Sequence, residues 1–265
     1  MNALTAYIDG IGLLGPGFNG WTDGQAVLAG DSAYQPGKTV LPAPASLPPA
    51  ERRRCGAIVK LSLAVGIEAA AHAGRDPAFL ATVFSASGGD GYNCHEICQM
   101  LASEDRLISP TRFHNSVHNA AAGYWSIATG ARAPSSVLSA FDASFGAGLL
   151  EALSQVAVDH IDSLLIAGDT TYPEPLRKTR PIPDEMGVAL LLSPRRSEKS
   201  LAEIRVAMSR EAADRLPEPA LESLRCAIPA ARSLPLLATL ARRESKRVVI
   251  DYLDHARLAV EVQPC

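Results

Sequence analysis

The sequence is poor in aromatic residues and has no marked excess of charge of either sign. Aromatic side chains make up 5% of its 265 residues, and the formal net charge is −3 at pH 7. Proteins that bind nucleic acids normally carry a basic excess over the binding domain. We therefore expect no nucleic-acid partner.

Long uninterrupted apolar segments are also missing. Proline, arginine or glycine cuts every apolar run well short of the 18 residues that suggest a membrane-spanning helix. Residues 1–9 lack the basic region and apolar stretch of a secretory signal. The cysteines are Cys55, Cys94, Cys98, Cys226 and Cys265. This odd, scattered set fits reduced thiols better than a disulfide framework. Together these features predict a cytoplasmic protein that does not enter a membrane.

What the sequence does contain is an alternation of apolar, strand-like segments with helix-like ones. Strands are expected over residues 5–11, 81–86, 136–140, 163–167 and 186–193, and a glycine-rich turn over residues 10–17. Helices are expected over residues 50–74, 93–104, 116–129 and 143–159. Strands that are apolar throughout and alternate with helices are typical of a sheet covered on both faces. The sequence therefore predicts a layered α/β fold.

The pattern changes after Pro194. Strand-like segments at residues 203–208 and 247–253 flank a proline-punctuated, arginine-rich region, residues 210–243, that is mainly helical in character. We therefore expect a main domain over residues 1–194 and a C-terminal extension, residues 195–265, that packs on it.

Four segments, in the same order, resemble β-ketoacyl synthases. The longest is Ile108–Gly130, in which a Ser-Pro pair precedes Asn-x-x-Ala-Gly, Ser-Ile and a glycine. The others are Tyr-Ile-Asp-Gly-Ile-Gly with a later Gly-Pro-Gly near the start, Ala167-Gly-Asp169, and the apolar run Met186–Leu192. The resemblance implies one half of a thiolase-type fold, layered α/β/α, with a mixed five-stranded sheet and a short C-terminal appendage. The family's second half, with its two catalytic histidines, has no room in the remaining 70 or so residues.

The resembling enzymes carry a nucleophilic cysteine between a strand and a helix, where N–H groups and the helix dipole lower its pKa and form an oxyanion site. Aligning on Gly148–Ala152 puts Asp142 at that position, and a shift of one residue puts Phe141 there. Neither can form a thioester. Asp142 is expected to cap the following helix, with a catalytic or gating role as the alternative. Ser144 lies outside a Gly-x-Ser-x-Gly elbow, so we interpret it as a helix-surface or capping residue.

Two other clusters suggest metal chemistry but fall short of it. His114 and His118 lie four residues apart, and a pair is too few ligands for zinc, so packing or hydrogen bonding is the preferred interpretation. Cys94, His95 and Cys98 match no common zinc spacing, so we expect the cysteines to be small buried core residues. The glycine turns lack the residues of a phosphate loop. We expect no metal and no cofactor.

The resemblance to chain length factors implies a subunit without catalytic activity of its own. Such a subunit pairs with a full-length β-ketoacyl-ACP synthase as a heterodimer and shapes the acyl or polyene tunnel in fatty-acid, aryl polyene or polyketide biosynthesis. The candidate tunnel and interface residues are His114, His118, Asn119, Tyr124, Trp125, Ser144 and Phe145. Arginine-rich runs at residues 52–54 and 242–247 are either solvated surface or a transient dock for an acidic acyl carrier protein.

Two alternatives remain from the sequence. One is a β-ketoacyl synthase-type acyltransferase or malonyl-ACP decarboxylase that uses an unusual active-site residue. The other is a purely structural homodimer. Acylation of a thiol or serine of this chain would favour the enzyme, and indifference to an added ketosynthase would favour the homodimer.

Overall fold

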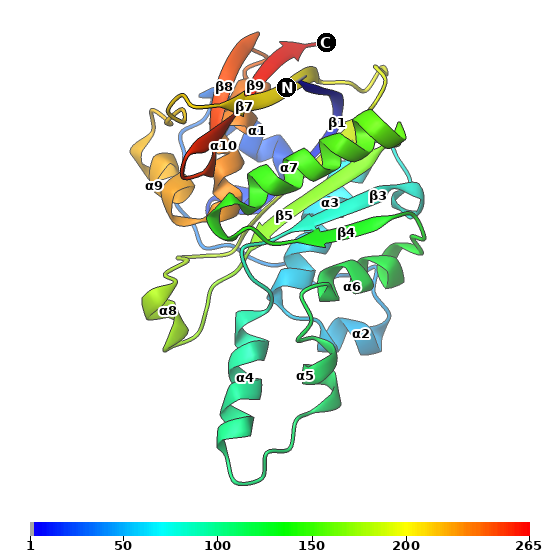
Figure 1. Cartoon of the computed structure of the whole chain (residues 1–265), viewed down its shortest axis with the longest axis vertical. Coiled ribbons are helices and arrows are strands. Elements are labelled where there is room, and N and C mark those ends of the chain that lie inside the picture. The colour runs from blue at the N-terminus through cyan, green and yellow to red at the C-terminus, as the bar shows by residue number, and fades with distance from the viewer. Residues whose placement is uncertain (1–2) are drawn as a thin grey trace.

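The computed structural model describes residues 3–265 and contains a mixed sheet in the order β4-β3-β5-β6-β1-β7-β9-β8, with the short β2 paired to β1 (Figure 1). The strands are β1 Leu4–Gly15, β2 Phe18–Asn19, β3 Ala81–Ser85, β4 Ser135–Leu138, β5 Ser163–Asp169, β6 Met186–Ser193, β7 Ala202–Ser209, β8 Lys246–Leu253 and β9 Ala256–Pro264. The five strands from β4 to β1 are the predicted mixed sheet. Only the β3–β4 and β3–β5 pairs in it are parallel.

Helices cover both faces of this sheet. The α-helices are α1 Trp21–Ala29, α2 Pro49–Arg54, α3 Ala57–Ala73, α4 Gly91–Ala102, α5 Pro110–His114, α6 Ala120–Thr129, α7 Ser144–Ser154, α8 Leu176–Thr179, α9 Pro219–Ala227 and α10 Leu234–Ala241. Side chains of β5 alternate between two cores: Leu164 faces the core with α3 and α6, and Leu165 the core with α1, α7 and α10. The predicted layered α/β/α fold is confirmed.

The prediction of a turn beginning at Gly10 is wrong, because β1 continues through it to Gly15. The glycines serve close packing instead. A Cβ atom at Gly10 or Gly12 would clash with main-chain carbonyl oxygens of α3, those of Ala69 and Val65. Glycine lets the backbone of β1 lie directly against the backbone of α3.

The predicted single helix over residues 50–74 is also wrong, since α2 and α3 are separate. The break falls at Cys55 and Gly56, whose backbones are extended. A Cβ atom at Gly56 would overlap the carboxylate of Asp90, so the chain has to turn here without a side chain. Near residue 120, α6 starts four residues later than predicted, and a π-helical turn at Gln155–Asp159 follows α7.

Residues after Ser193 extend the sheet rather than forming a separate layer. β7 pairs with β1, β9 pairs with β7, and β8 forms the far edge. β9 was not predicted from the sequence. Two segments of this region, α10 and the 3₁₀ turn Pro229–Ser233, are buried against the core that holds α7.

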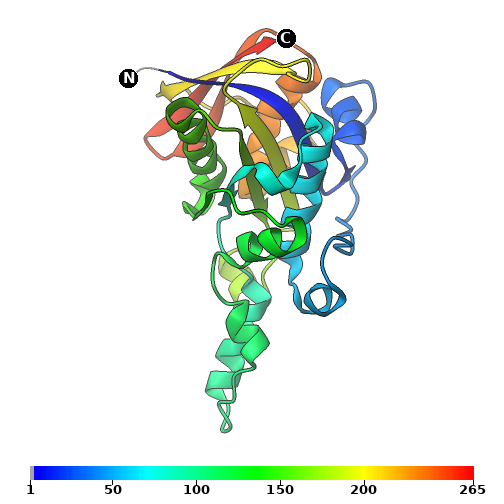
Figure 2. The same cartoon turned by 90° about the vertical axis from the view of Figure 1, so that its right-hand side faces the viewer.

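Residues 91–115, here called the arm, leave the body as a helical hairpin made of α4 and α5. Figures 1 and 2 show it extending away from the sheet, at the end opposite the chain termini. The amide of Asn93 donates to the Arg112 carbonyl at 2.8 Å, and the amide of Asn115 donates to the Arg54 carbonyl at 2.8 Å. Cys94 and Cys98 lie exposed on α4, so the prediction that they are core residues is wrong. A projecting hairpin offers them no second layer to pack against.

Candidate functional site at the junction of β4 and α7

The junction keeps a tight strand-to-helix turn. A 3₁₀ turn, Phe141–Ala143, follows β4 and leads directly into α7. Phe141 has φ = 52°, a left-handed conformation that is uncommon and strained for a residue with a large side chain. The Ser144 hydroxyl donates to the Phe141 carbonyl at 2.7 Å and accepts from the Ala140 N–H at 3.0 Å. Ser144 is buried and holds the turn closed, so it does not lie on the helix surface.

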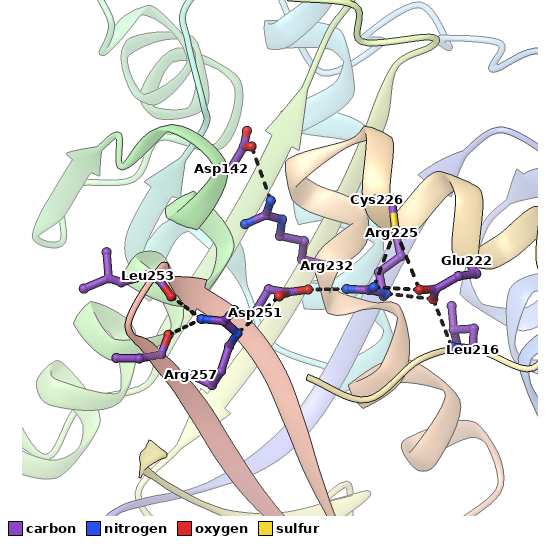
Figure 3. Close-up of polar contacts among 10 residues, drawn as sticks. Asp142, Leu216, Glu222, Arg225, Cys226, Arg232, Asp251, Leu253 and Arg257 are labelled. Carbon is purple, nitrogen blue, oxygen red and sulfur yellow. Dashed lines mark hydrogen bonds and ion pairs between the residues drawn. The ribbon is translucent and has the colours of Figure 1, made fainter. Parts of the chain in front are cut away.

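The side chains of Phe141 and Asp142 both meet arginines. Phe141 is 63% exposed, and the guanidinium of Arg180 lies 3.9 Å above its ring centroid. Asp142 forms ion pairs with Arg180 at 2.5 Å and with Arg232 at 3.3 Å; Figure 3 shows the second of these. The prediction that Asp142 caps α7 is wrong. The helix begins two residues later, and the carboxylate faces the two guanidinium groups instead.

Asp169, at the end of β5, lies fully buried behind this turn. Its carboxylate accepts the N–H of Ser87 at 2.9 Å and the N–H of Ala230 at 2.8 Å. Burial raises the pKa of Asp169, while hydrogen bonds from Ser87 act in the opposite direction. These hydrogen bonds connect the end of β5 with the loop after β3 and with the C-terminal extension. The sequence marked the Ala167-Gly-Asp169 segment but not this role.

The glycine turn after β3 is required by a packed tyrosine. Cβ atoms at Gly88 and Gly91 would overlap the ring or hydroxyl of Tyr172, which comes from the loop after β5. Burial raises the pKa of Tyr172. The turn therefore serves packing between two loops at the carboxyl ends of β3 and β5.

Apart from Ser144, the predicted tunnel residues fall into two groups. His114 and Asn119 line an open groove with Phe113 and Val117, and His118 lines a narrow apolar pocket between α3, α6 and β3. That pocket has about 20 Å³ of free space, room for roughly one water molecule.

The second group of predicted tunnel residues lies in the cores. Tyr124 and Trp125 are buried on the α3 side of the sheet, and Phe145 is buried on the α7 side. The Tyr124 hydroxyl donates to the Asn115 side chain at 3.1 Å, and Trp125 packs edge-on against Phe84. In the single chain these three side chains fill the interior.

A polar cluster connects α9 with β8, close to the ion pairs of Asp142 (Figure 3). Arg225 is 8% exposed, donates to both carboxylate oxygens of Glu222 at 2.8 and 2.6 Å, and also pairs with Asp251. Hydrogen bonding from Arg225 lowers the pKa of Glu222 to about 2. The cluster holds the C-terminal extension in place beside the turn.

Residues 3–265 contain neither a cluster of metal-ligating side chains nor a helix able to span a membrane. Over residues 3–265, no three or more His, Cys, Asp or Glu side chains are grouped so as to hold a metal ion. In that same part of the chain, each helix is too short or too polar to cross a membrane.

Comparisons with known proteins agree with this architecture. The family model described as "Beta-ketoacyl synthase, N-terminal domain" matches residues 25–251. A chain of the ketosynthase ApeO in complex with its chain length factor ApeC, from Xenorhabdus doucetiae, has a TM-score of 0.73 and 22% identity, over 97% of this chain and 99% of that chain.

Two further solved structures are similar over nearly their whole length. A chain of the AntDE:AntF complex, a type II polyketide synthase acyl-carrier protein with its hexaketide-bound ketosynthase, has a TM-score of 0.75 and 12% identity, over 100% of both chains. The ishigamide ketosynthase/chain length factor has a TM-score of 0.68 and 14% identity, over 98% of this chain and 99% of that chain. The comparison with curated proteins gave no match.

Proposed function

Because the chain belongs to the family of β-ketoacyl synthase N-terminal domains, we propose that it is a non-catalytic subunit of the chain length factor type. In this proposal it pairs, in the cytoplasm, with an active β-ketoacyl-ACP synthase and shapes the tunnel for an acyl, polyene or polyketide chain. The neighbouring structures support this reading, since they are ketosynthases with a chain length factor or with an acyl carrier protein.

One observation carries the proposal: the strained turn is kept, but a phenylalanine stands at its tip. A nucleophile elbow is a tight strand-to-helix turn that exposes the reacting side chain. Phe141, with its positive φ and exposed ring, has that place, and Asp142 follows it. Ser144, three residues further along the chain, is buried and already hydrogen-bonded on both sides. We therefore assign the position of the missing cysteine to Phe141.

The surface beside the turn supports a protein partner. Within residues 3–265, β4 pairs only with β3 and forms one edge of the sheet, and an open strand edge is a template for another chain. The arm also exposes large apolar side chains, and their contact with water is unfavourable in free energy. These are Tyr92, Met100, Leu101, Leu107 and Phe113. The partner proposed for this surface is the ketosynthase. The acyl carrier protein is proposed to bind only transiently.

The catalytic half of the proposal is tested by acylation. The chain is co-expressed with a candidate ketosynthase, incubated with an acyl carrier protein thioester and analysed by mass spectrometry. We expect the acyl group on the ketosynthase and none on this chain. An acyl group on Ser144 or on any cysteine of this chain would instead support the synthase or decarboxylase alternative.

The pairing half is tested with two variants matched in exposure. Leu107, in the arm, is 74% exposed, and Val158, on the π-helical turn after α7, is 72% exposed. We expect Leu107→Asp to reduce co-purification with the ketosynthase at least tenfold and Val158→Asp to leave it unchanged. Equal effects of the two variants, or a homodimer that ignores the added ketosynthase, would contradict the proposed pairing.

A further inference from the structure

Two guanidinium groups converge on one carboxylate beside Phe141. Arg180 approaches Oδ1 of Asp142 at 2.5 Å, and Arg232 approaches Oδ2 at 3.3 Å. Arg180 comes from the connection between β5 and β6, and Arg232 from the turn before α10. Because each oxygen faces a different arginine, the arrangement is shaped for a planar carboxylate.

The cluster carries more positive than negative charge, and it is largely shielded from water. The side chains of Arg180 and Arg232 are 18% and 20% exposed, and that of Asp142 is 37% exposed. They line a pocket of about 200 Å³ whose other walls are mainly apolar, formed by Pro181, Ile182, Ala227 and Pro229. Apolar walls strengthen the attraction of the spare positive charge for an anion.

The donors of this pocket are not all used by Asp142. Nη2 of Arg180 is buried and, although close to Asp142, makes no aligned hydrogen bond. Asp169 also interacts with Arg180 through its charge, but its carboxylate oxygens accept two backbone N–H groups and no hydrogen bond from Nη2 of Arg180. A buried donor without an aligned acceptor is a costly feature that a ligand can relieve.

We propose that Arg180 and Arg232 form a carboxylate-binding site that the chain occupies with its own Asp142, and that a small free carboxylate takes the same place when Asp142 is removed or displaced. The ligand class is a small dicarboxylate, because one carboxylate can take the place of Asp142 between the two arginines and a second carboxylate adds to the attraction for their positive charge. Binding at this pocket requires no partner subunit, so its test does not depend on the proposed pairing.

The test is calorimetric titration of the full chain with malonate, acetate and inorganic phosphate. We expect Asp142→Asn to bind malonate at least tenfold more tightly than the unaltered chain does, and acetate more weakly than malonate. Adding Arg232→Gln to that variant should reverse the gain by at least tenfold. Asp142→Ala, which frees the same pocket without leaving an amide, should behave like Asp142→Asn. Glu211→Gln, which frees Arg247 near the start of β8, should leave malonate binding unchanged.

Three results would overturn the assignment. The first is equal malonate binding by the unaltered chain and by both carboxyl-free variants of Asp142. The second is binding that persists when Arg232→Gln is added, because this places the anion elsewhere. The third is tighter binding of phosphate than of malonate in Asp142→Asn, because the pocket would then select tetrahedral anions. Thermal unfolding of each variant confirms that the titrated protein is folded.

Discussion

The ion pairs of Arg225 allow a stability prediction with a defined pH dependence. In Glu222→Gln the side chain keeps its shape and an oxygen that can accept the Leu216 N–H, but it loses the charge that faces Arg225. The pKa of Glu222 is lowered from 4.5 to about 2, which corresponds to roughly 3 kcal/mol of folding free energy at neutral pH. Solvent screening at this partly exposed pair reduces the expected loss to about 1.5 kcal/mol.

The sign of the pH dependence follows from the direction of the pKa shift. A carboxyl group with a lowered pKa in the folded state contributes stability above its unfolded pKa and loses it as the pH falls through its folded pKa. The difference in free energy of unfolding between the unaltered chain and Glu222→Gln should therefore have its full value at pH 7. This difference should decrease from about pH 5 towards pH 2. Urea unfolding at several pH values, followed by circular dichroism, measures this difference.

A matched control lies on the neighbouring surface. Glu211 also receives two hydrogen bonds from one arginine, Arg247, but its side chain is 62% exposed. We expect Glu211→Gln to cost less than about 0.5 kcal/mol, because exposed ion pairs contribute little. A difference for Glu222→Gln that stays constant from pH 7 to pH 3, or one no larger than that of the control, would refute the reasoning.

Four further outcomes follow from packing and hydrogen bonding, and thermal or urea unfolding checks each of them. Gly12→Ala should destabilise the fold by about 3 kcal/mol or more, because its Cβ meets the backbone of α3, whereas Gly123→Ala, with open space around it in α6, should stabilise by about 0.5 kcal/mol. Ser144→Ala should cost about 1–2 kcal/mol through two lost hydrogen bonds. Asp169→Asn should cost about 2 kcal/mol, because an amide cannot accept both backbone N–H groups as well. An unchanged free energy of unfolding in Gly12→Ala or in Asp169→Asn would show that the backbone moves more freely here than we infer.

Strands were predicted well where apolar character runs along the whole element. The bounds of β6 were predicted to the residue, and those of β7 and β8 to within one residue. The single helix predicted over residues 50–74 is wrong because the backbone is extended at Cys55 and Gly56, and Asp90, which is distant in the sequence, leaves no room for a side chain at Gly56. β9 was missed, although its pairing with β7 and β8 extends the sheet.

The strand and the helix that flank the junction were predicted from the sequence, but the contacts of its side chains were not. The sequence indicated that no thiol stands at the junction after β4, and it left Phe141 and Asp142 as alternatives for that position. The left-handed backbone of Phe141 favours the first, and no sequence pattern reports a single dihedral angle. The capping interpretation of Asp142 was wrong because it rested on local preference, which ignores the arginines that approach from elsewhere.

The sequence by itself determined the family, the layered α/β class and the absence of a cysteine at the junction, since these depend on residue identity and local periodicity. Only the tertiary structure decided how the junction is used. Arg232 lies 90 residues from Asp142 along the chain, and a buried Asp169 links three segments that are distant in sequence. Such contacts arise from how the sheet and its connections bring remote segments together, and periodicity along a chain carries no information about them.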